Sequence, residues 1–417
     1  MKFLFSTWGS RGDYHPFLAL ALALQKRGHQ VTLGANPYWE EETRDQGVGF
    51  VATESYVSPD IVFDYPEILS HQQWGLKALD LFINQFFAPQ LDLTVNVLSK
   101  EATTHDLLLA HHFVLAAPVV AQKTKIPFAT AVLAPGVIRS RYTAPAGAYH
   151  HPFTGEIGEI LNDLFWTLGA KWCQRVIRQT MDSFYQRQNL SPQSDYVFGT
   201  WSKELVLQLY SRHFAVSAPD YPPFFKQTGF CFKDSSEEKI DPALELFLKS
   251  GEKPWLFTLG TVAVLDPGSF YREAVDSVRG TSERALLLVG RTENIPEDLP
   301  LNVMAVAYAP HEKVMPYCKG VIHQCGVGGV GQSLRAGIPS VGCPYAFDQP
   351  NNAKRLEALG VGFVLNRKNR RAKDFRRAFE ALSNMNAFEK AKGIGEKIRS
   401  ESGIERSCEI LEKTKQA

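Results

Sequence analysis

The sequence has almost no net charge, no closely spaced cysteines and no long apolar run. Its 45 lysines and arginines against 44 aspartates and glutamates leave a formal charge of +1, so no overall field would attract nucleic acid. The six cysteines form no C-x-x-C pair and no zinc-finger spacing, which argues against a disulfide framework and favours a reduced cytoplasm. No stretch of about 18 apolar residues exists, so nothing is expected to span a bilayer.

What is present is typical of a folded, water-soluble protein of two or three domains. The chain has 417 residues, of which 44% are hydrophobic and 21% charged. Short β-rich segments alternate with helical patterns in two series, which predicts parallel sheets covered by helices. The expected strands are Lys2–Thr7, Gln30–Leu33, Asp106–Ala110 and Phe128–Leu133, then Trp255–Leu259, Ala285–Val289, Val303–Ala307, Val321–His323 and Ser340–Cys343.

The fold class is therefore α/β with two doubly wound, Rossmann-like domains. The first helix is expected to have Pro16 in its first turn and to end at Gly28. A proline-rich stretch near 218–223 and a polar one near 233–239 suggest a boundary. We divide the chain into an N-terminal domain, a linker, a C-terminal domain and final helices that can pack back on the first domain, at 1–218, 219–240, 241–386 and 387–417.

Three segments carry two interpretations each. The aromatic-rich segment 136–200 suggests helices lining an apolar cleft, although ordinary core packing is the preferred explanation for any single aromatic in it. His150 and His151 are read as exposed loop residues, with acceptor contact as the alternative. The basic run 367–373 favours a solvated helix entry, with docking on an anionic membrane surface as the alternative.

The strongest chemical motif is the glycine-rich segment 321–334. Here a strand ending at His323 is followed by glycines and a helix, an arrangement whose free N–H groups and helix dipole suit a phosphate. The same segment matches G-x-G-x-x-G at Gly326, Gly328 and Gly331, so a dinucleotide site must be weighed. Asp348, however, stands in the loop 344–350 and not at a strand end, and its neighbour Gln349 completes a pair suited to sugar hydroxyls.

Two further loops follow strands and can share a cleft with that segment. The loop 258–261 offers the backbone of Gly260 and the hydroxyl of Thr261 to the same phosphates. The turn 8–16 places Asp13 at a strand-to-helix junction. On its own, Asp13 is best explained as a helix cap.

Two blocks together resemble a known family. Gly9-Ser10-Arg11-Gly12-Asp13 followed by 16–21, and His323 through Asp348-Gln349 with 334–339 between, are similar to the nucleotide-sugar-dependent glycosyltransferases of GT-B fold. The likeness covers nearly the whole chain. It is nearest to the branch of the UDP-glycosyltransferase superfamily with sterol glucosyltransferases, rhamnolipid rhamnosyltransferases and glycopeptide-antibiotic glycosyltransferases, and it implies two domains facing each other across a cleft.

The resemblance also implies roles. It places the diphosphate of the donor at the glycine turn after His323 and the transferred sugar at Asp348 and Gln349. The uracil or thymine of the donor would lie beside the segment 308–311, and the catalytic general base would stand at the family's N-terminal position. The implied catalytic residue is Asp13, and the donor-binding candidates are Gly12, Gly260, Thr261, Arg291, Tyr308, His323, Gly326, Val327, Gly328, Gly329, Asp348 and Gln349.

The chain departs from the family pattern in two places. The usual His-His-Gly-Gly-x-Gly-Thr reads His-Gln-Cys-Gly-Val-Gly-Gly at 323–329, so the terminal hydroxyl is missing at Gly329. Where many relatives place an acid after the strand 106–110, this chain has His111-His112. We hypothesise that Asp13 and His111 form a reversed acid and imidazole pair, which is wrong if they lie too far apart for a direct or one-water contact.

The implied reaction is an inverting transfer of a hexose, most simply from UDP-glucose, to a hydroxyl of a sterol, lipid or polycyclic natural product. Neither a metal nor a cofactor is expected, nor a nucleic-acid partner, whereas peripheral membrane contact stays open. Three alternatives remain at this point: a nicotinamide-dependent oxidoreductase, a sugar-nucleotide epimerase or hydrolase, and a non-catalytic nucleotide-binding scaffold. The sequence leaves the oligomeric state undetermined.

Overall fold

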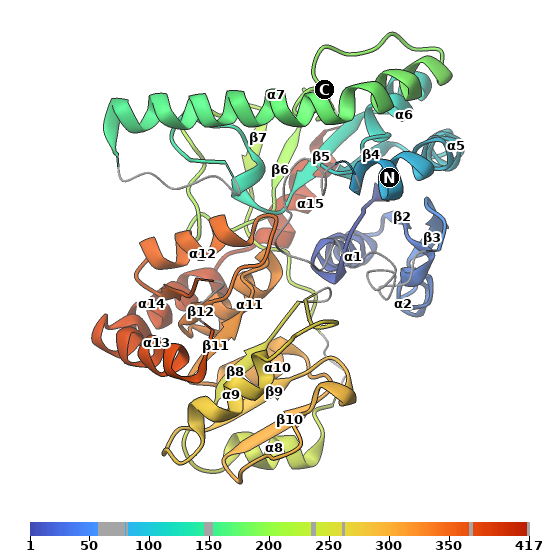
Figure 1. Cartoon of the computed structure of the whole chain (residues 1–417). Helices are drawn as coiled ribbons and strands as arrows, with labels where there is room; N and C mark the ends of the chain where they lie inside the picture. Colours follow the sequence, from blue (N-terminus) through green and yellow to red (C-terminus); the bar gives the residue numbers. More distant parts are fainter. Residues whose placement is uncertain are drawn as a thin grey trace. The chain divides into compact units, whose positions relative to one another are not determined.

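The chain forms two compact α/β units, each built on a parallel sheet (Figure 1). The computed structural model describes residues 1–56, 80, 82–145, 153–234, 239–260, 263–366 and 370–414. The first unit comprises Met1–Arg212, Ser217–Lys233 and Ser402–Ala417, and the second comprises His213–Val216 and Asp234–Glu401. The α/β class with two parallel-sheet units is thereby confirmed.

The first unit contains a seven-stranded sheet in the order β3-β2-β1-β4-β5-β6-β7. Because β1 pairs on one side with β2 and on the other with β4, the strand order reverses between β1 and β4. Such a reversal is where ligands bind in open parallel sheets. The strands are β1 (Lys2–Ser6), β2 (Gln30–Ala35), β3 (Gly49–Ala52), β4 (Leu107–His111), β5 (Phe128–Val132), β6 (Val206–Gln208) and β7 (Phe225–Gln227).

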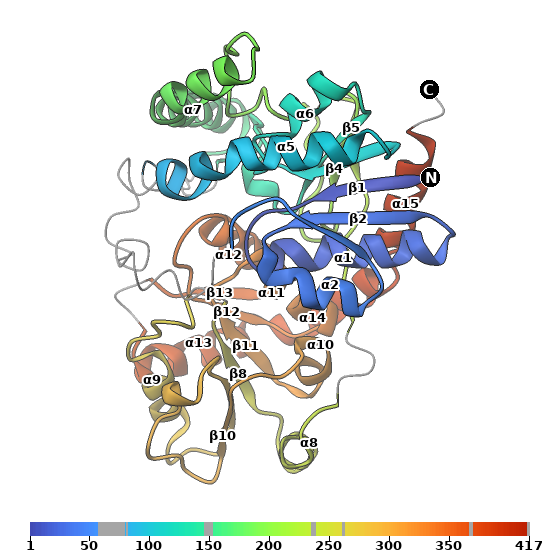
Figure 2. The ribbon, with the colours of Figure 1, turned by 90° about the vertical axis from the view of Figure 1, so that its right-hand side faces the viewer.

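Helices connect these strands and cover the sheet (Figure 2). The α-helices are α1 (Arg11–Lys26), α2 (Glu40–Asp45), α5 (Leu91–Ala102), α6 (Ala117–Thr124), α7 (Gly155–Arg187) and, from the end of the chain, α15 (Gly403–Lys413). Short turns of other types are the 3-10 helices η1 (Pro37–Trp39), η4 (Ala88–Gln90) and η5 (Pro135–Val137), and the π-helix η3 (Phe82–Phe87).

The second unit repeats the design with six strands in the order β10-β9-β8-β11-β12-β13. Its strands are β8 (Trp255–Thr258), β9 (Ala285–Leu288), β10 (Val303–Val306), β11 (Gly320–His323), β12 (Ser340–Gly342) and β13 (Gly362–Val364). Its helices are α8 (Pro242–Lys249), α9 (Phe270–Val278), α10 (His311–Val314), α11 (Val327–Ala336), α12 (Gln349–Ala358), α13 (Ala372–Asn384) and α14 (Ala387–Arg399), with the 3-10 turns η6 (Thr292–Asn294) and η7 (Met315–Tyr317).

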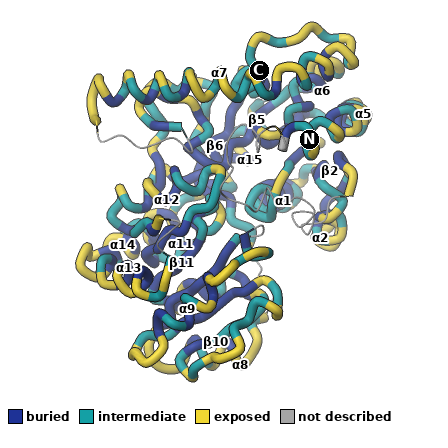
Figure 3. The backbone as a smooth tube through the Cα atoms, viewed as in Figure 1, coloured by how far each residue is buried: buried dark blue, intermediate teal, exposed yellow. Residues whose placement is uncertain are grey.

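The central strands of each sheet are deeply buried (Figure 3). Every residue of β4, β8 and β9 is buried, as expected for parallel strands covered on both faces. Such strands read as continuous apolar runs, which explains why most of them could be predicted within one or two residues. The strands β3, β6, β7 and β13 were missed, because none of them contains four consecutive apolar side chains.

The first helix begins earlier than predicted. It starts at Arg11, and Pro16 lies inside it and not at its first turn. The Asp13 carboxylate accepts hydrogen bonds from the Ser10 N–H at 2.8 Å and the Ser10 hydroxyl at 2.9 Å, which secures the helix start ahead of the proline.

The aromatic-rich segment forms the 33-residue helix α7 and not a group of short helices. Its aromatics divide between two environments: Trp166 and Tyr185 are buried, whereas Trp172 is exposed. Core packing therefore accounts for some of them and leaves others at the surface. Tyr149, His150 and His151 lie outside the described residues.

The segment expected to be a linker, 219–240, contains β7, which pairs with β6 as the edge strand of the first sheet. At the far end of the chain, α15 belongs to the first unit while α14 belongs to the second. Glu412 on α15 accepts two hydrogen bonds from Arg27, at 2.8 and 2.7 Å, and lies 2.8 Å from His29.

In the described parts of the chain, no helix combines the length and the apolar character needed to cross a bilayer.

Candidate active site

The turn between β1 and α1 holds Asp13 in a fixed orientation. Gly9 has φ +122°, and a Cβ there would lie 2.5 Å from Asp13 Oδ2, so only glycine allows the carboxylate to fold back onto the turn. Ser10 binds this same oxygen twice. The other carboxylate oxygen, Oδ1, lies 3.6 Å from His111 Nε2. Asp13 therefore both caps α1 and faces the end of β4.

His111 is placed by the sheet itself, because β1 and β4 are neighbours. Its side chain has no exposed surface, whereas that of Asp13 is 30% exposed. Phe17 and Phe113 lie edge-on to the imidazole, with ring centroids 6.1 and 5.5 Å away. The structure thus brings the two residues of the hypothesised pair within ion-pair distance, although 3.6 Å exceeds a hydrogen bond.

The electrostatics assign different tasks to the two side chains. Burial, and to a smaller extent the neighbouring His112, holds the pKa of His111 well below its usual value, so the imidazole is neutral. The Phe113 N–H points at His111 Nδ1 from 3.4 Å, which leaves the single ring proton for Nε2, on the side of Asp13. Of the two side chains, only that of Asp13 is exposed to solvent.

The second group of candidates lies at one edge of the other sheet. Gly260 follows β8, Arg291 follows β9 and Tyr308 follows β10, while His323 ends β11 and Asp348 follows β12. Because all these strands are parallel, their carboxyl ends meet at the same edge. Tyr308 is 54% exposed there, as a residue that meets a ligand must be. Thr261 lies outside the described residues.

The entry to α11 is open to an anion. Gly326 precedes the helix and offers no capping side chain. The Val327 N–H binds the Asp348 carboxylate, which leaves the N–H groups of Gly328 and Gly329 in the first turn for an anion. His323 is buried, and its Nδ1 has no hydrogen-bond partner among the described residues. Burial, with a smaller contribution from His311, lowers the pKa of His323 to about 3, so it is a neutral donor or acceptor.

The glycine that replaces the family's threonine at position 329 leaves space beside His323. A Cβ on Gly329 would lie 3.1 Å from His323 Nδ1, so a larger residue would crowd the imidazole edge that has no partner. On the other side, a Cβ on Gly260 would lie 2.0 Å from the Gln324 amide nitrogen, and one on Gly326 would lie 3.3 Å from it. Gln324, which sequence reasoning noted only as a departure from the motif, thus fills the space between two glycine loops.

Asp348 is tied to the same turn. Its carboxylate accepts a hydrogen bond from Asn352 Nδ2 at 2.6 Å, and the Val327 N–H also binds it. Burial raises the pKa of Asp348 to about 6. Asn352 also donates to the Cys325 carbonyl at 3.0 Å, and its Oδ1 is buried without a partner among the described residues. Sequence reasoning missed Asn352, although its position one helical turn after Asp348 was a usable signal.

Gln349 and Arg370 of the basic run both bind the backbone of the loop that follows β12. The Gln349 carbonyl oxygen accepts from the N–H groups of Tyr345 and Ala346, at 2.8 and 3.0 Å. Arg370 donates to the Pro344 carbonyl at 2.6 Å and stacks over the Tyr345 ring. Residues 367–369 lie outside the described part of the chain, so membrane docking by this run stays a prediction. Gly12 lies in the first turn of α1, beside the Ser10 hydroxyl.

Comparison with known proteins identifies the class. Residues 3–143 match the glycosyltransferase family 28 N-terminal domain, and residues 283–405 match the erythromycin biosynthesis protein CIII-like C-terminal domain. Together with two parallel-sheet α/β units, these matches define a glycosyltransferase of GT-B fold.

Curated relatives extend the match to the whole chain. The chain is 30% identical to O-mycaminosyltylonolide 6-deoxyallosyltransferase of Streptomyces fradiae, covering 99% of this chain and 97% of that protein. This chain therefore belongs to the GT-B nucleotide-sugar-dependent glycosyltransferases. It is also 26% identical to sterol 3-beta-glucosyltransferase of Aspergillus terreus, matching over 97% of this chain but spanning only 29% of that longer protein.

Solved structures agree on the fold. The glycosyltransferase of kitacinnamycin matches with a TM-score of 0.74 at 21% identity, covering 99% of this chain and 98% of that one. The calicheamicin glycosyltransferase CalG4 matches with a TM-score of 0.73 at 17% identity, with the same coverage. VinC, solved in complex with dTDP, matches with a TM-score of 0.72 at 16% identity over 100% of both chains.

Proposed function

We propose that this glycosyltransferase moves a hexose from a nucleoside diphosphate sugar, UDP-glucose, to a hydroxyl of an apolar small-molecule or lipid acceptor, with inversion and with Asp13 as general base. The observation that carries the base assignment is the contrast at the β1–α1 turn. Asp13 is 30% exposed and fixed by Ser10, while the His111 imidazole 3.6 Å away is fully buried. An acceptor can reach the carboxylate but not the imidazole.

On the acceptor side, the Asp13 carboxylate takes the proton of the acceptor hydroxyl as that oxygen attacks the anomeric carbon. His111 is a positioning residue in this proposal. Its neutral imidazole presents Nε2–H to Asp13 Oδ1 and keeps the carboxylate in one orientation without adding a second charge. A positioned base contributes roughly 10²- to 10⁴-fold to a rate.

On the donor side, the bond from the anomeric carbon to the diphosphate breaks, and its electron pair leaves with the diphosphate. The N–H groups of Gly328 and Gly329 in the first turn of α11, and the His323 Nδ1 that has no partner among the described residues, are suited to the charge that develops there. Asp348 and Gln349 are proposed to hold hydroxyls of the sugar. Because Gln349 uses its carbonyl within its own loop, its NH₂ group is the part that remains for a ligand.

The names of two relatives support the proposed donor and acceptor classes. One is a sterol 3-beta-glucosyltransferase and another transfers 6-deoxyallose to a macrolide, so both act on apolar ring systems. The glucosyltransferase favours glucose as the sugar. VinC was solved with dTDP, which makes thymidine diphosphate sugars the first alternative donors.

The test is a donor panel of UDP-glucose and dTDP-sugars, each assayed with and without a pool of sterol and polycyclic acceptors. We expect glycoside formation that requires acceptor, and we expect Asp13→Asn to reduce turnover by roughly 10²- to 10⁴-fold while donor affinity is unchanged. Donor consumed equally fast without acceptor would instead identify an epimerase or hydrolase. Full turnover in Asp13→Asn would remove the base assignment.

Two neighbouring histidines supply a matched control. His111 faces Asp13, whereas His112 is also buried but has neither ring nitrogen hydrogen-bonded among the described residues. His111→Phe should lower kcat about tenfold, less than Asp13→Asn does, because only the orientation of the base is lost. His112→Phe should leave kcat unchanged, and equal effects in the two variants would contradict the positioning role.

A further inference from the structure

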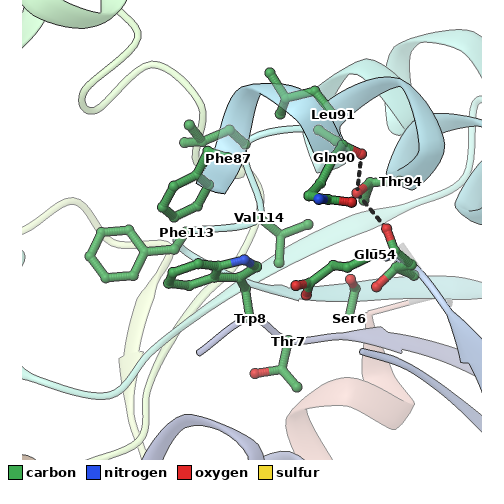
Figure 4. A pocket seen from close by; sticks show the side chains of 13 residues that line it. Ser6, Thr7, Trp8, Glu54, Phe87, Gln90, Leu91, Thr94, Phe113 and Val114 are labelled. Atoms are coloured by element: carbon green, nitrogen blue, oxygen red, sulfur yellow. Dashed lines mark hydrogen bonds between the residues drawn. The ribbon is translucent and has the colours of Figure 1, made fainter. Parts of the chain in front are cut away.

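A pocket in the first unit lies next to the candidate base and is not used by the proposed chemistry. Its cavity volume is about 20 Å³, enough for one small polar group, and it opens to solvent. Its residues come from the ends of β1 and β3, from η3 to α5, and from the segment after β4 (Figure 4). Thr7, which lines it, donates a hydrogen bond to the Asp13 carbonyl at 3.1 Å. Phe113, which also lines the pocket, has its ring centroid 5.5 Å from that of His111.

One wall of the pocket is aromatic. Trp8 stacks on Phe87 with ring centroids 4.2 Å apart and an interplanar angle of 27°, and Phe113 meets Phe87 edge-on at 6.3 Å. Trp8 belongs to the same turn as Asp13, so a flat apolar molecule lying against these rings would reach toward the base. Stacked aromatic side chains provide a large apolar area of this kind.

The floor of the pocket is polar, and its side chains make few hydrogen bonds. Glu54 is 7% exposed, and the single hydrogen bond to it within the described chain is a long one, 3.4 Å from Asn36 Nδ2. The Ser6 hydroxyl is fully buried and has no partner among the described residues. Thr94, in contrast, donates to the Thr53 carbonyl at 2.7 Å. Figure 4 shows the Glu54 side chain reaching into the pocket beside Ser6 and toward Trp8.

Burying a carboxyl group with so little hydrogen bonding is costly. Desolvation raises the pKa of Glu54 to about 7, so near neutral pH the group exchanges its proton readily and can accept a hydrogen bond in either form. An arriving donor group would offset the cost of this burial. The aromatic wall and the polar floor together describe a ligand that is apolar along its body and polar at one end.

We propose that this pocket recognises a second polar group of the acceptor, a hydroxyl or ammonium that donates a hydrogen bond to Glu54, while the reacting hydroxyl lies at Asp13. The inference rests on the proposed function and narrows its acceptor class. Preferred acceptors are apolar ring systems with a hydrogen-bond donor at each end. A ring system with a single hydroxyl, such as a simple 3-hydroxysterol, leaves Glu54 and Ser6 without a donor and is the weaker acceptor.

The test compares three steroids with one reacting hydroxyl: one with no second polar group, one with a second hydroxyl at the far end of the rings, and one with an amino group there. We expect kcat/KM to be roughly 10- to 100-fold higher for the two polar steroids, mainly through KM. Glu54→Leu should abolish this preference without reducing transfer to the plain steroid. Glu54→Gln should keep the preference for the hydroxyl but lose that for the ammonium.

Glu41→Gln, which changes an exposed carboxyl group on α2, is the control and should retain the wild-type preference. Ser6→Ala offers a second variant if Glu54→Leu does not fold, and it should weaken the preference in the same direction. Equal kcat/KM for all three steroids in the wild type, or an unchanged ratio in folded Glu54→Leu, overturns the recognition role alone. Absence of transfer to any acceptor from any donor overturns the proposed function as well.

Discussion

Asp13 and Glu54, two carboxyl groups of the first unit, differ in environment and therefore in the chemistry they can perform. Asp13 is partly exposed, bound twice by Ser10 and close to a neutral imidazole. Glu54 is almost fully buried in a pocket with an aromatic wall. Different surroundings give different acid–base behaviour to the same functional group. Here they separate a proposed base from a proposed recognition group.

Burial of Glu54 makes a specific prediction about stability and pH. Its pKa is raised from 4.5 to about 7 in the folded state, so between these pH values the folded chain keeps a proton that the unfolded chain releases. The stabilisation is fully present below pH 4.5 and is lost as pH rises toward 7, a change of up to about 3 kcal/mol in the free energy of unfolding. Thermal melting of wild type and Glu54→Gln from pH 5 to pH 8 measures this change.

Since the amide of the Glu54→Gln variant does not titrate, the variant should gain stability relative to wild type as the pH rises. The raised pKa of Asp348 affects both proteins equally and cancels in the difference. A difference in melting temperature that stays constant with pH would mean that Glu54 titrates normally and would weaken the case for its desolvation.

Among the elements, the β1–α1 turn shows how one glycine serves both the backbone and the placement of the proposed base. Gly9 adopts φ +122°, which side chains rarely allow, and its missing Cβ leaves room for the Asp13 carboxylate. The turn was expected from the sequence as a helix start. Its dependence on Gly9 appears only when the carboxylate is seen folded back on it.

Gly9→Ala should therefore impair transfer more than stability. Backbone strain of this kind costs about 1–3 kcal/mol, and the added methyl group would also push the Asp13 carboxylate out of place. Gly47→Ala is the matched control, since Gly47 has φ +73° but a methyl group there would meet no atom within 4 Å. Urea denaturation should show a loss of stability in both variants, larger in Gly9→Ala because the Ser10–Asp13 contacts are also disturbed, whereas kcat should fall only in Gly9→Ala. A normal kcat in Gly9→Ala would show that the position of the carboxylate is not critical.

Prediction of the elements themselves succeeded where the pattern was long. Buried strands such as β4 and β9 were predicted because four or five consecutive apolar residues are typical of a parallel strand covered on both faces. The start of α1 was misplaced because Pro16 is a strong signal for a first turn, and the Ser10–Asp13 contacts that extend the helix compete with it. A separate kind of error placed β7 in a linker, since an edge strand of three residues has no distinctive pattern.

At the scale of the whole molecule, the end of the chain completes the first unit. Ser407 on α15 donates to the Thr228 hydroxyl at 2.8 Å, and Cys408 and Leu411 are fully buried. Glu412 also accepts two hydrogen bonds from Arg27. The last helix thus stabilises the unit that begins with residue 1.

Deleting residues 402–417 should destabilise the first unit and leave the second intact. Exposing a buried apolar helix face costs several kcal/mol, so we expect the melting transition of the first unit to fall by roughly 10 °C or to be lost. Calorimetry measures the melting of the first unit, and nucleotide binding reports whether the second unit is still folded. Binding should persist in the deletion variant. Glu412→Gln is the control, because removing one ion-paired carboxylate costs about 1 kcal/mol or less. A deletion variant that melts like the full chain would show that α15 contributes no stability.

The sequence by itself determined the local features: two series of buried strands, the glycine turns, and the carboxyl, imidazole and amide groups at strand ends. These follow from patterns within a few neighbouring residues, which fix backbone conformation locally. Only the tertiary structure decided which of those groups meet. The pairing of β1 with β4 brings Asp13 to His111, the burial of Glu54 creates the polar floor of a pocket, and α15 returns to the first unit. Such contacts join segments far apart in the chain, and no local pattern encodes them.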